Sequence, residues 1–406
     1  MTGPDDQRRP DQRRPGPRAR PAPAGRGAGR GTPARRVALE AMVAIAGGAR
    51  ANVEVPARLT RSGLDERDRG LVTELVYGAT RMRRACDWLV DRHVRGRTDD
   101  EVRAALRLGA YQLAYLDTPP HAAVGSTVDA VAGPGRSLVN AVLRRAAADL
   151  ARGRPRWPDP ATELSYPDWI VARLARDLGP GPARAALETM NQAAAATRRH
   201  DGYTQDLASQ WVAAAVGAQP GDRVVDLCAA PGGKATAMAH AGPRVVVAAD
   251  IDPARAAVVA ANAATVGTAN VATVVADAAA PPLRPGCADR VLVDAPCSGL
   301  GVLRRRPDAR WRVQPGDVDR LARLACRLLD AAVPLLRPGG TLVYSVCTLT
   351  AAETAGVDHW LATAHPELEP LPPPDGPWQP AGRGALLLPQ AAGTDGMFLL
   401  RVRTPD

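Results

Sequence analysis

A change of rhythm near residue 203 constrains the fold of this chain more than any other feature of the sequence. Beyond it, short Val-rich runs alternate with helix-like segments, a pattern typical of an α/β domain with a largely parallel sheet. Ligands bind such sheets at the carboxyl ends of the strands, where the polar motifs of this chain fall. The strands are expected at 222–227, 244–250, 271–277, 289–295, 340–346 and 397–402.

The first half of the chain has a different pattern. Between residues 37 and 152, apolar residues recur at intervals of three and four, the spacing of amphipathic helices. No strand-like alternation interrupts them, so we expect an all-helical domain over 37–152. Proline-rich 152–169 leads out of that domain. We expect linker helices over 153–202 and the sheet domain over 203–406.

The first 36 residues form a separate basic segment. They hold ten arginines against three aspartates, in a chain whose net charge is +10. Because this segment has almost nothing apolar to bury, we expect residues 1–36 to be a disordered tail. Two interpretations stay open: the tail attracts a polyanion such as RNA, or it is solvated and has no specific role.

Several classes of protein are disfavoured. The chain has no run of about 18 apolar residues, and its N-terminus lacks the apolar core of a secretory signal. We therefore expect a cytoplasmic protein without a membrane segment. The six cysteines include no CxxC pair and the six histidines no HExxH motif, which disfavours a disulfide framework or a metal site.

The first motif is DLCAAPGGKATAMA (226–239), a small-residue turn between a strand and a helix. Its glycines let the backbone approach a ligand, and the helix start offers free N–H groups. The motif is neither GxGxxG nor a Walker A loop, so neither a dinucleotide nor a triphosphate is specifically indicated. Lys234 is the only lysine of the chain, which suggests that a compact ammonium is required there. A tight structural turn is the alternative.

Three of the expected strands end in an aspartate, the first of them at the start of this motif. Asp250 follows the Gly-rich loop by about twenty residues, where a carboxylate can accept both hydrogen bonds of a ribose diol. Asp252 competes for that role, although it can also cap the helix that begins at Pro253. Asp277 ends the third strand, where it can receive the exocyclic amine of an adenine. The sequence therefore favours a nucleoside site.

Two loops that each contain a cysteine follow the fourth and fifth strands. DAPCSG contains Cys297 and YSVCTL contains Cys347. Both loops lie at carboxyl ends of strands in one sheet, so both cysteines can face a common site. The alternative is that each is a small buried apolar residue, the usual state of a free cysteine.

Together these motifs resemble a known family. DLCAAPGGKATAMA, AADIDPAR, DAPCSGLGVLRRRPDARW and YSVCTLTAAET are similar to the motif series of the S-adenosylmethionine-dependent RNA 5-methylcytosine methyltransferases, the NOL1/NOP2/Sun family. YGATRMRR, AYQLAYLDTPPHAAV and LVNAVLRR resemble the NusB-like domain found in the bacterial ribosomal RNA small subunit methyltransferase B branch. The resemblance covers about 37–190 and 203–403. It implies an all-helical, RNA-binding NusB-like domain followed by a Rossmann-like class I methyltransferase domain.

The resemblance also implies an activity. The enzyme would transfer a methyl group from S-adenosyl-L-methionine to C5 of a cytosine in RNA, with 16S rRNA as the expected substrate and a monomer as the expected state. Cys347 would be the nucleophile that adds to C6, and Cys297 would assist release of the adduct. Asp294 would bind the cytosine, and Lys234 would act on the pyrimidine side, where an ammonium can lower a nearby thiol pKa.

The same resemblance implies a set of methyl-donor contacts. Asp250 would bind the ribose, and Asp277 would lie near the adenine. The full set is Cys228, Ala229, Ala230, Pro231, Gly232, Gly233, Lys234, Asp250, Asp277 and Asp294.

Two departures from the family pattern stand out. Val346 replaces the usual threonine, and the segment 190–206 lacks a few dozen residues that form a small RNA-contacting subdomain in the family. The loop 304–312, with arginines around Trp311, can stack on and clamp single-stranded RNA in its place, or it is simply a solvated basic loop. Two rival functions remain: methylation of tRNA, and RNA binding without catalysis by a degenerate methyltransferase domain.

Overall fold

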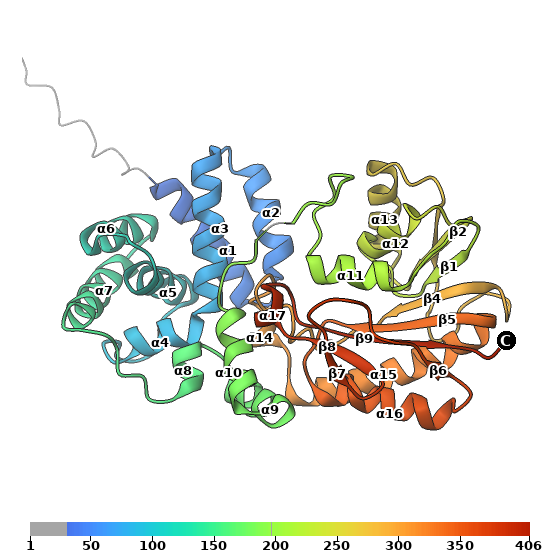
Figure 1. The fold of residues 1–406 in the computed structure, drawn as a ribbon. Coiled ribbons are helices and arrows are strands. Elements are labelled where there is room, and N and C mark those ends of the chain that lie inside the picture. The colour runs from blue at the N-terminus through green and yellow to red at the C-terminus, as the bar shows by residue number, and fades with distance from the viewer. Residues whose placement is uncertain (1–30, 196) are drawn as a thin grey trace, which may run out of the picture.

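The computed structural model describes residues 31–195 and 197–406, and it places a helical part beside a part built on a sheet (Figure 1). The helical part is packed around a core that includes Leu75, Leu106 and Leu143. Its helices are α1 (Thr32–Ala46), α2 (Ala51–Arg61), α3 (Glu66–Arg81), α4 (Arg83–Asp91), α5 (Asp100–Tyr115), α6 (Pro120–Ala130) and α7 (Gly135–Ala151). The all-helical first half expected from the sequence is confirmed.

The start of α1 corrects the boundary expected for the basic tail. Residues 32–36 are helical, with a proline in the first turn, where its missing N–H costs nothing. Arg35 is buried, and its Nε donates to Gln112 Oε1 at 2.8 Å. These residues therefore belong to the helical part, while residues 1–30 of the expected tail lie outside the described residues.

The helices expected as linkers belong to the core of the sheet part. They are α8 (Pro160–Leu164), α9 (Asp168–Leu178) and α10 (Pro180–Thr189). Ile170 and Leu174 of α9 share one apolar cluster with Val291 and Val293, which lie in the middle of the sheet. Between α10 and α11 (Leu207–Ala215), the described residues form a turn closed by a bridge between Arg198 and Thr204.

The sheet is mostly parallel, as expected. The parallel strands are β1 (Arg223–Asp226), β2 (Val245–Asp250), β3 (Val271–Val275), β4 (Ala288–Asp294) and β5 (Leu336–Val346), in the order β3-β2-β1-β4-β5. An antiparallel edge continues this sheet through β9 (Met397–Arg403), β8 (Gly384–Leu387) and β7 (Gln379–Ala381), with β6 (Glu369–Pro370) pairing β9. The three strands β6–β8 were not expected, because they are short and lie in a proline-rich stretch without alternation.

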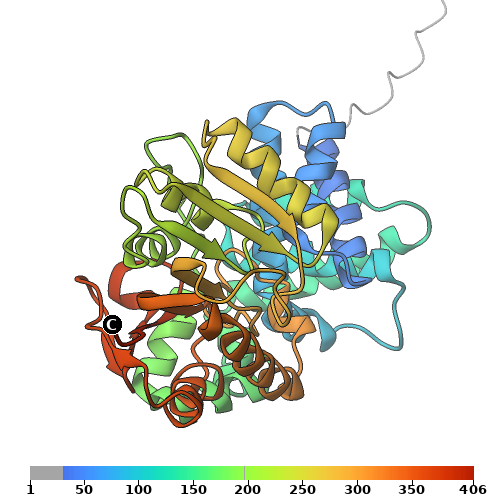
Figure 2. The same ribbon diagram turned by 90° about the vertical axis from the view of Figure 1, so that its right-hand side faces the viewer.

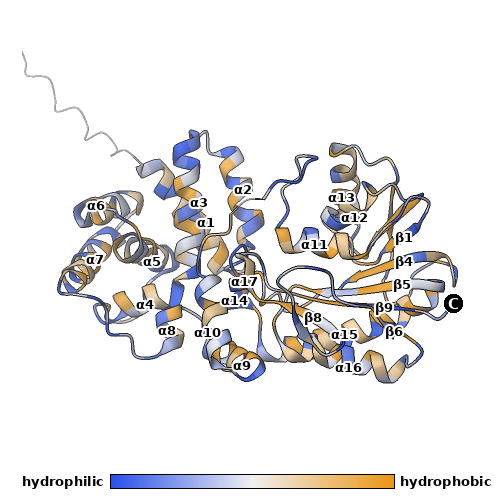
Figure 3. Cartoon of the chain, in the orientation of Figure 1, coloured by the Kyte–Doolittle hydropathy of each residue, from blue (hydrophilic) through white to orange (hydrophobic). Residues whose placement is uncertain are grey.

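Helices cover both faces of the sheet (Figure 2). Along β4, Leu292 packs in one apolar cluster whereas Val291 and Val293 pack in the other, the two-residue period of a strand buried on both faces. Figure 3 shows β1 and β4 as mostly hydrophobic. One face carries α11, α12 (Gly233–Ala239) and α13 (Pro253–Thr265), and the other carries α8–α10, α15 (Pro315–Ala332), the short helix η1 (Val333–Leu335) and α16 (Ala355–Ala364).

Within 31–195 and 197–406, no helix is long and apolar enough to cross a membrane. The remaining short helices are α14 (Ala309–Arg312), η2 (Ala351–Glu353) and α17 (Pro389–Ala392).

Candidate active site

The loop of residues 228–234, here called the donor loop, connects β1 to α12 at the carboxyl end of the sheet. Gly232 has φ 101°, a conformation that side chains rarely adopt, and a Cβ there would lie 3.2 Å from the Cα of Val259 in α13. The glycine therefore lets the loop turn against α13, and α12 begins with its N–H groups at the sheet edge.

One of the predicted carboxylates contacts this loop, and another follows the strand β3. Asp250, at the end of β2, is buried and accepts from the backbone N–H groups of Ala230 (3.3 Å) and Asp252 (3.1 Å). Asp252 caps α13 through Ala254 N at 2.8 Å, which is the capping role that the sequence left open for it. Asp277 follows β3 and is exposed, with its Oδ1 accepting from Ala279 N at 2.8 Å.

Asp226, the last residue of β1, lies just before the donor loop, and it was not among the predicted site residues although it ends a strand as Asp250 does. It is buried, and its Oδ1 accepts from Cys228 N at 3.4 Å. Its Oδ2 has no hydrogen-bond partner in the described part of the chain. Burial, reinforced by the nearby Asp294 carboxylate, raises the pKa of Asp226 to about 7.

Lys234 and Asp294, 60 positions apart, form an ion pair in which Nζ lies 2.6 Å from Oδ2. Burial lowers the pKa of Lys234, but the charge of Asp294 and its hydrogen bond outweigh that effect and leave the pKa above its ordinary value. Lys234, the only lysine of the chain, therefore keeps its proton beside the carboxylate that ends β4.

Cys297 and Cys347 lie side by side, with 3.3 Å between their sulfur atoms. The hydrogen bond from Cys297 lowers the pKa of Cys347, against the opposing effect of burial, and Arg306 and Lys234 add their positive charge. The same hydrogen bond raises the pKa of Cys297 well above its ordinary value, and burial raises it further. Within the pair, the environment therefore favours loss of a proton from Cys347 over loss from Cys297.

Glu353, in η2, joins the two cysteine loops and was missed by sequence reasoning. Its carboxylate accepts from Ser298 N (2.6 Å), Ser298 Oγ (2.6 Å), Thr348 Oγ1 (3.2 Å) and Thr350 Oγ1 (2.7 Å). Ser298 follows Cys297 and Thr348 follows Cys347, so one buried side chain fixes both loops. Its only sequence signal was an acidic residue shortly after YSVCTL.

The loop 304–312, for which the sequence left an RNA clamp and a solvated basic loop open, combines exposed Arg306 with side chains that contact other parts of the protein. Arg310 is fully buried, and its Nη1 donates to the carbonyls of Arg81 (3.2 Å) and Ser165 (3.1 Å). Trp311 Nε1 donates to Thr80 O at 2.7 Å. These side chains join α3 of the helical part to the sheet part, and Arg310 and Trp311 supply donors to main-chain carbonyls there.

Residues 31–195 and 197–406 contain no cluster of three or more His, Cys, Asp or Glu side chains able to hold a metal ion. The fold and the site together define a Rossmann-like methyltransferase domain that follows a helical domain. The donor loop after β1, the carboxylate ending β2 and the strand order β3-β2-β1-β4-β5 are its elements.

Comparisons with known families agree with this class. The model of the family described as 16S rRNA methyltransferase RsmB/F matches residues 213–403, and that of the NusB family matches residues 32–148. The chain is 35% identical to the ribosomal RNA small subunit methyltransferase B of Thermus thermophilus, covering 91% of this chain and 97% of that protein. It is also 35% identical to a putative methyltransferase of Mycobacterium tuberculosis, covering 91% and 96%.

The chain therefore belongs to the RsmB/F family of methyltransferases, and S-adenosylmethionine is its methyl donor. The fold agrees with the crystal structure of a protein called PH0851, with a TM-score of 0.75 over 91% of this chain and 98% of that one, at 21% sequence identity.

Proposed function

We propose that this protein methylates C5 of a cytosine in 16S rRNA through a covalent bond between Cys347 and C6 of the base. The observation that carries the proposal is the sulfur pair, 3.3 Å apart, in which Cys347 has a lowered pKa and Cys297 a raised one. The relatives in Thermus thermophilus and Bacillus subtilis carry the name ribosomal RNA small subunit methyltransferase B, which supports ribosomal RNA as the substrate.

The chemistry requires a nucleophile because C5 of cytosine is itself a weak one. The Cys347 thiolate adds to C6, and the electrons of the C5–C6 double bond move to C5. S-adenosylmethionine supplies the methyl group that C5 then takes. Water removes the C5 proton, the double bond re-forms, and the C6–S bond breaks to return the thiolate. Cys297 stabilises that departing thiolate by donating its S–H.

Asp294 and Lys234 act on the pyrimidine in this proposal. We assign Asp294 to the cytosine N3 and amine, at the end of the strand that precedes the Cys297 loop. Lys234 holds a proton 2.6 Å from Asp294 Oδ2, so its ammonium offers positive charge where negative charge would develop in the ring. Cys297 and Cys347 follow the adjacent strands β4 and β5, and Asp294 is the last residue of β4.

The donor loop and its carboxylates fit an S-adenosylmethionine molecule. The site offers backbone N–H groups at the start of α12, an exposed carboxylate at Asp277 for an adenine amine, and the fixed carboxylate of Asp250 for ribose hydroxyls. We assign the methyl donor to residues 228–234 with Asp250, Asp277 and Asp294. The buried Oδ2 of Asp226, without a partner in the described ranges, is a further acceptor behind this loop.

The substrate and setting follow from the same assignment. We place the enzyme in the cytoplasm as a monomer, with the helical domain α1–α7 contributing to RNA binding and the sheet domain carrying the reaction. The turn between α10 and α11 replaces a larger RNA-contacting subdomain, so RNA contacts must come from other elements.

Two cysteine variants test the mechanism. Purified Cys297→Ala is expected to accumulate a covalent protein–RNA adduct when mixed with 16S rRNA and S-adenosylmethionine, seen as a band of reduced mobility on a denaturing gel. Cys347→Ala is expected to give no adduct, because it lacks the attacking sulfur. Cys326→Ala, a half-buried cysteine of α15, is the matched control and should behave as wild type. Accumulation of the adduct by Cys347→Ala would reverse the assignment.

A further inference from the structure

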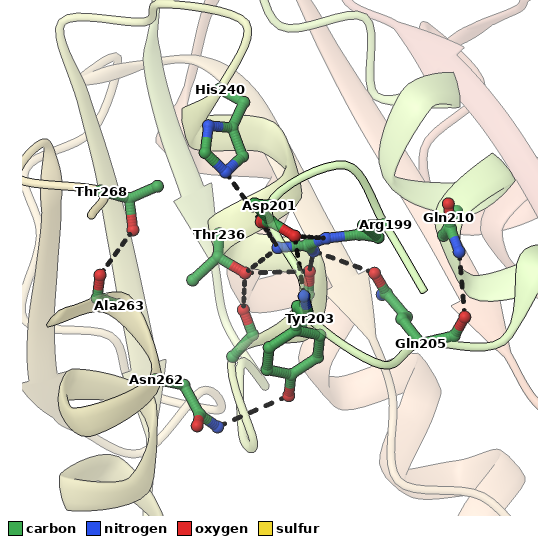
Figure 4. Close-up of polar contacts among 12 residues, drawn as sticks. Arg199, Asp201, Tyr203, Gln205, Gln210, Thr236, His240, Asn262, Ala263 and Thr268 are labelled. Atoms are coloured by element: carbon green, nitrogen blue, oxygen red, sulfur yellow. Dashed lines mark hydrogen bonds and ion pairs between the residues drawn. The ribbon is translucent and has the colours of Figure 1, made fainter. Parts of the chain in front are cut away.

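The turn of residues 197–206, here called the brace, contains a buried ion pair that the proposed reaction does not use. The Arg199 guanidinium donates to both carboxylate oxygens of Asp201, through Nε to Oδ1 and through Nη2 to Oδ2. The two side chains are 4% and 5% exposed. Asp201 also accepts from Tyr203 N at 3.0 Å and contacts His240 Nε2 at 2.8 Å (Figure 4). Burying such a pair is costly unless every group is satisfied, so its presence here calls for a reason.

The brace contacts the donor loop directly. Arg199 Nη1 donates to Gly233 O, and Nη2 donates to Thr236 Oγ1 at 3.0 Å, in the first turn of α12 (Figure 4). A Cβ on Gly233 would lie 3.0 Å from the Tyr203 ring and 3.2 Å from Gln205 Nε2. The brace therefore touches the loop too closely for a side chain to stand between them.

Two other carbonyls of the donor loop accept hydrogen bonds from side chains of α13. Arg255 Nη2 donates to Ala230 O at 3.3 Å, and Asn262 Nδ2 donates to Pro231 O at 2.8 Å. With Gly233 O bound by Arg199, three carbonyls of the loop accept from side chains outside it. These hydrogen bonds restrain the donor loop, because each one holds a peptide unit of the loop in place.

We propose that the brace holds the donor loop in its methyl-donor-binding shape, with Arg199 as the positioning residue. Arg199 itself touches no ligand in this account, because it acts through Gly233 and the first turn of α12. The inference rests on S-adenosylmethionine as the methyl donor and not on the choice of cytosine or of RNA. Its failure is therefore distinguishable from failure of the proposed function.

Equilibrium binding of S-adenosylhomocysteine and of sinefungin to the full chain, measured by calorimetry, tests the proposal without any RNA. Arg199→Gln is expected to weaken binding of both about tenfold, the effect of losing one strong hydrogen bond to the loop. Arg199→Lys keeps the charge but cannot bridge Asp201, Gly233 and Thr236 together, so it should recover only part of the affinity.

Two further variants separate positioning from folding. Arg107→Gln removes a similar two-bond pair with Asp87 in the helical part, at 2.8 and 2.9 Å, and should leave ligand affinity unchanged. Tyr203→Ala removes the half-buried ring against Gly233 and should weaken binding even if Arg199→Gln does not fold. If Arg199→Gln folds and its affinity for the two ligands is unchanged, the proposal is wrong. If only Tyr203→Ala folds, unchanged affinity in that variant overturns the proposal. An equal loss of affinity in Arg107→Gln would also overturn it.

Discussion

Asp226 shows how one buried carboxyl couples the stability of this fold to pH. Its folded-state pKa of about 7 lies above the ordinary value near 4, mainly because of burial. Between about pH 4 and 7 the folded chain keeps a proton that the unfolded chain has released, so this carboxyl costs stability as pH rises. Asp226 therefore makes its full favourable contribution to the free energy of unfolding only below the pKa that it has in the unfolded chain.

Asp226→Asn removes this dependence. Relative to wild type, the free energy of unfolding of the variant is expected to increase across that range by up to about 4 kcal/mol. Urea unfolding at a series of pH values measures the difference. Asp319→Asn, on an exposed position of α15, is the control and should track wild type. Parallel curves for Asp226→Asn and wild type would contradict the burial argument.

For single residues, the sequence predicted which side chains would lie near one another better than it predicted the chemical role of each. The loops with Cys297 and Cys347 were expected to face one site because both follow strands of one sheet, and the structure brings their sulfurs together. Which cysteine loses its proton depends on a hydrogen bond and on the charges of Lys234 and Arg306, and these are visible only in three dimensions. Because both cysteines follow strands of one sheet, their positions in the sequence made either one a possible nucleophile.

At the scale of elements, η2 determines how the two cysteine loops lie relative to each other. Glu353→Ala would leave the hydroxyl groups of Ser298 and Thr350 and the N–H of Ser298 without their acceptor. The Ser298 hydroxyl still has Thr348 Oγ1 as a partner, so two donors are left unpaired. Each hydrogen bond to a charged group contributes about 1.5–3 kcal/mol, so the variant is expected to lose about 3–6 kcal/mol of unfolding free energy.

Chemical denaturation measures this loss. Glu163→Ala removes an exposed pair with Arg184 at 3.2 Å and should change stability by no more than about 0.5 kcal/mol. An equal loss of unfolding free energy in Glu353→Ala and Glu163→Ala would contradict this role of η2.

The elements that the sequence predicted well are those with a strong period. The five parallel strands and β9 were expected near their observed places, because each is a Val- or Leu-rich run between turns. The short strands β6–β8 carry no such period and gain their order from pairing with β9. The helices α8–α10 are amphipathic, but their partner, the face of β4 that carries Val291 and Val293, is far away in sequence.

In the whole molecule, hydrogen bonds from side chains of one domain to main-chain carbonyls of the other join the two domains. Arg310 and Trp311 donate to the main chain of residues 80–81, and Arg81 Nη2 donates back to Arg304 O at 3.0 Å. These partners lie more than 220 positions apart in the chain. An arginine-rich loop beside a tryptophan has the same composition whether it binds RNA or carbonyl groups, so the sequence could not distinguish the two.

The central claim is that the assembled molecule methylates C5 of a cytosine in ribosomal RNA. Bisulfite sequencing of ribosomal and transfer RNA from a strain that lacks the gene tests it most directly. We predict that one 5-methylcytosine disappears from 16S rRNA, returns with the wild-type gene and does not return with Cys347→Ala. A loss confined to transfer RNA would support the tRNA alternative. An unchanged 5-methylcytosine map in both RNAs would contradict the account.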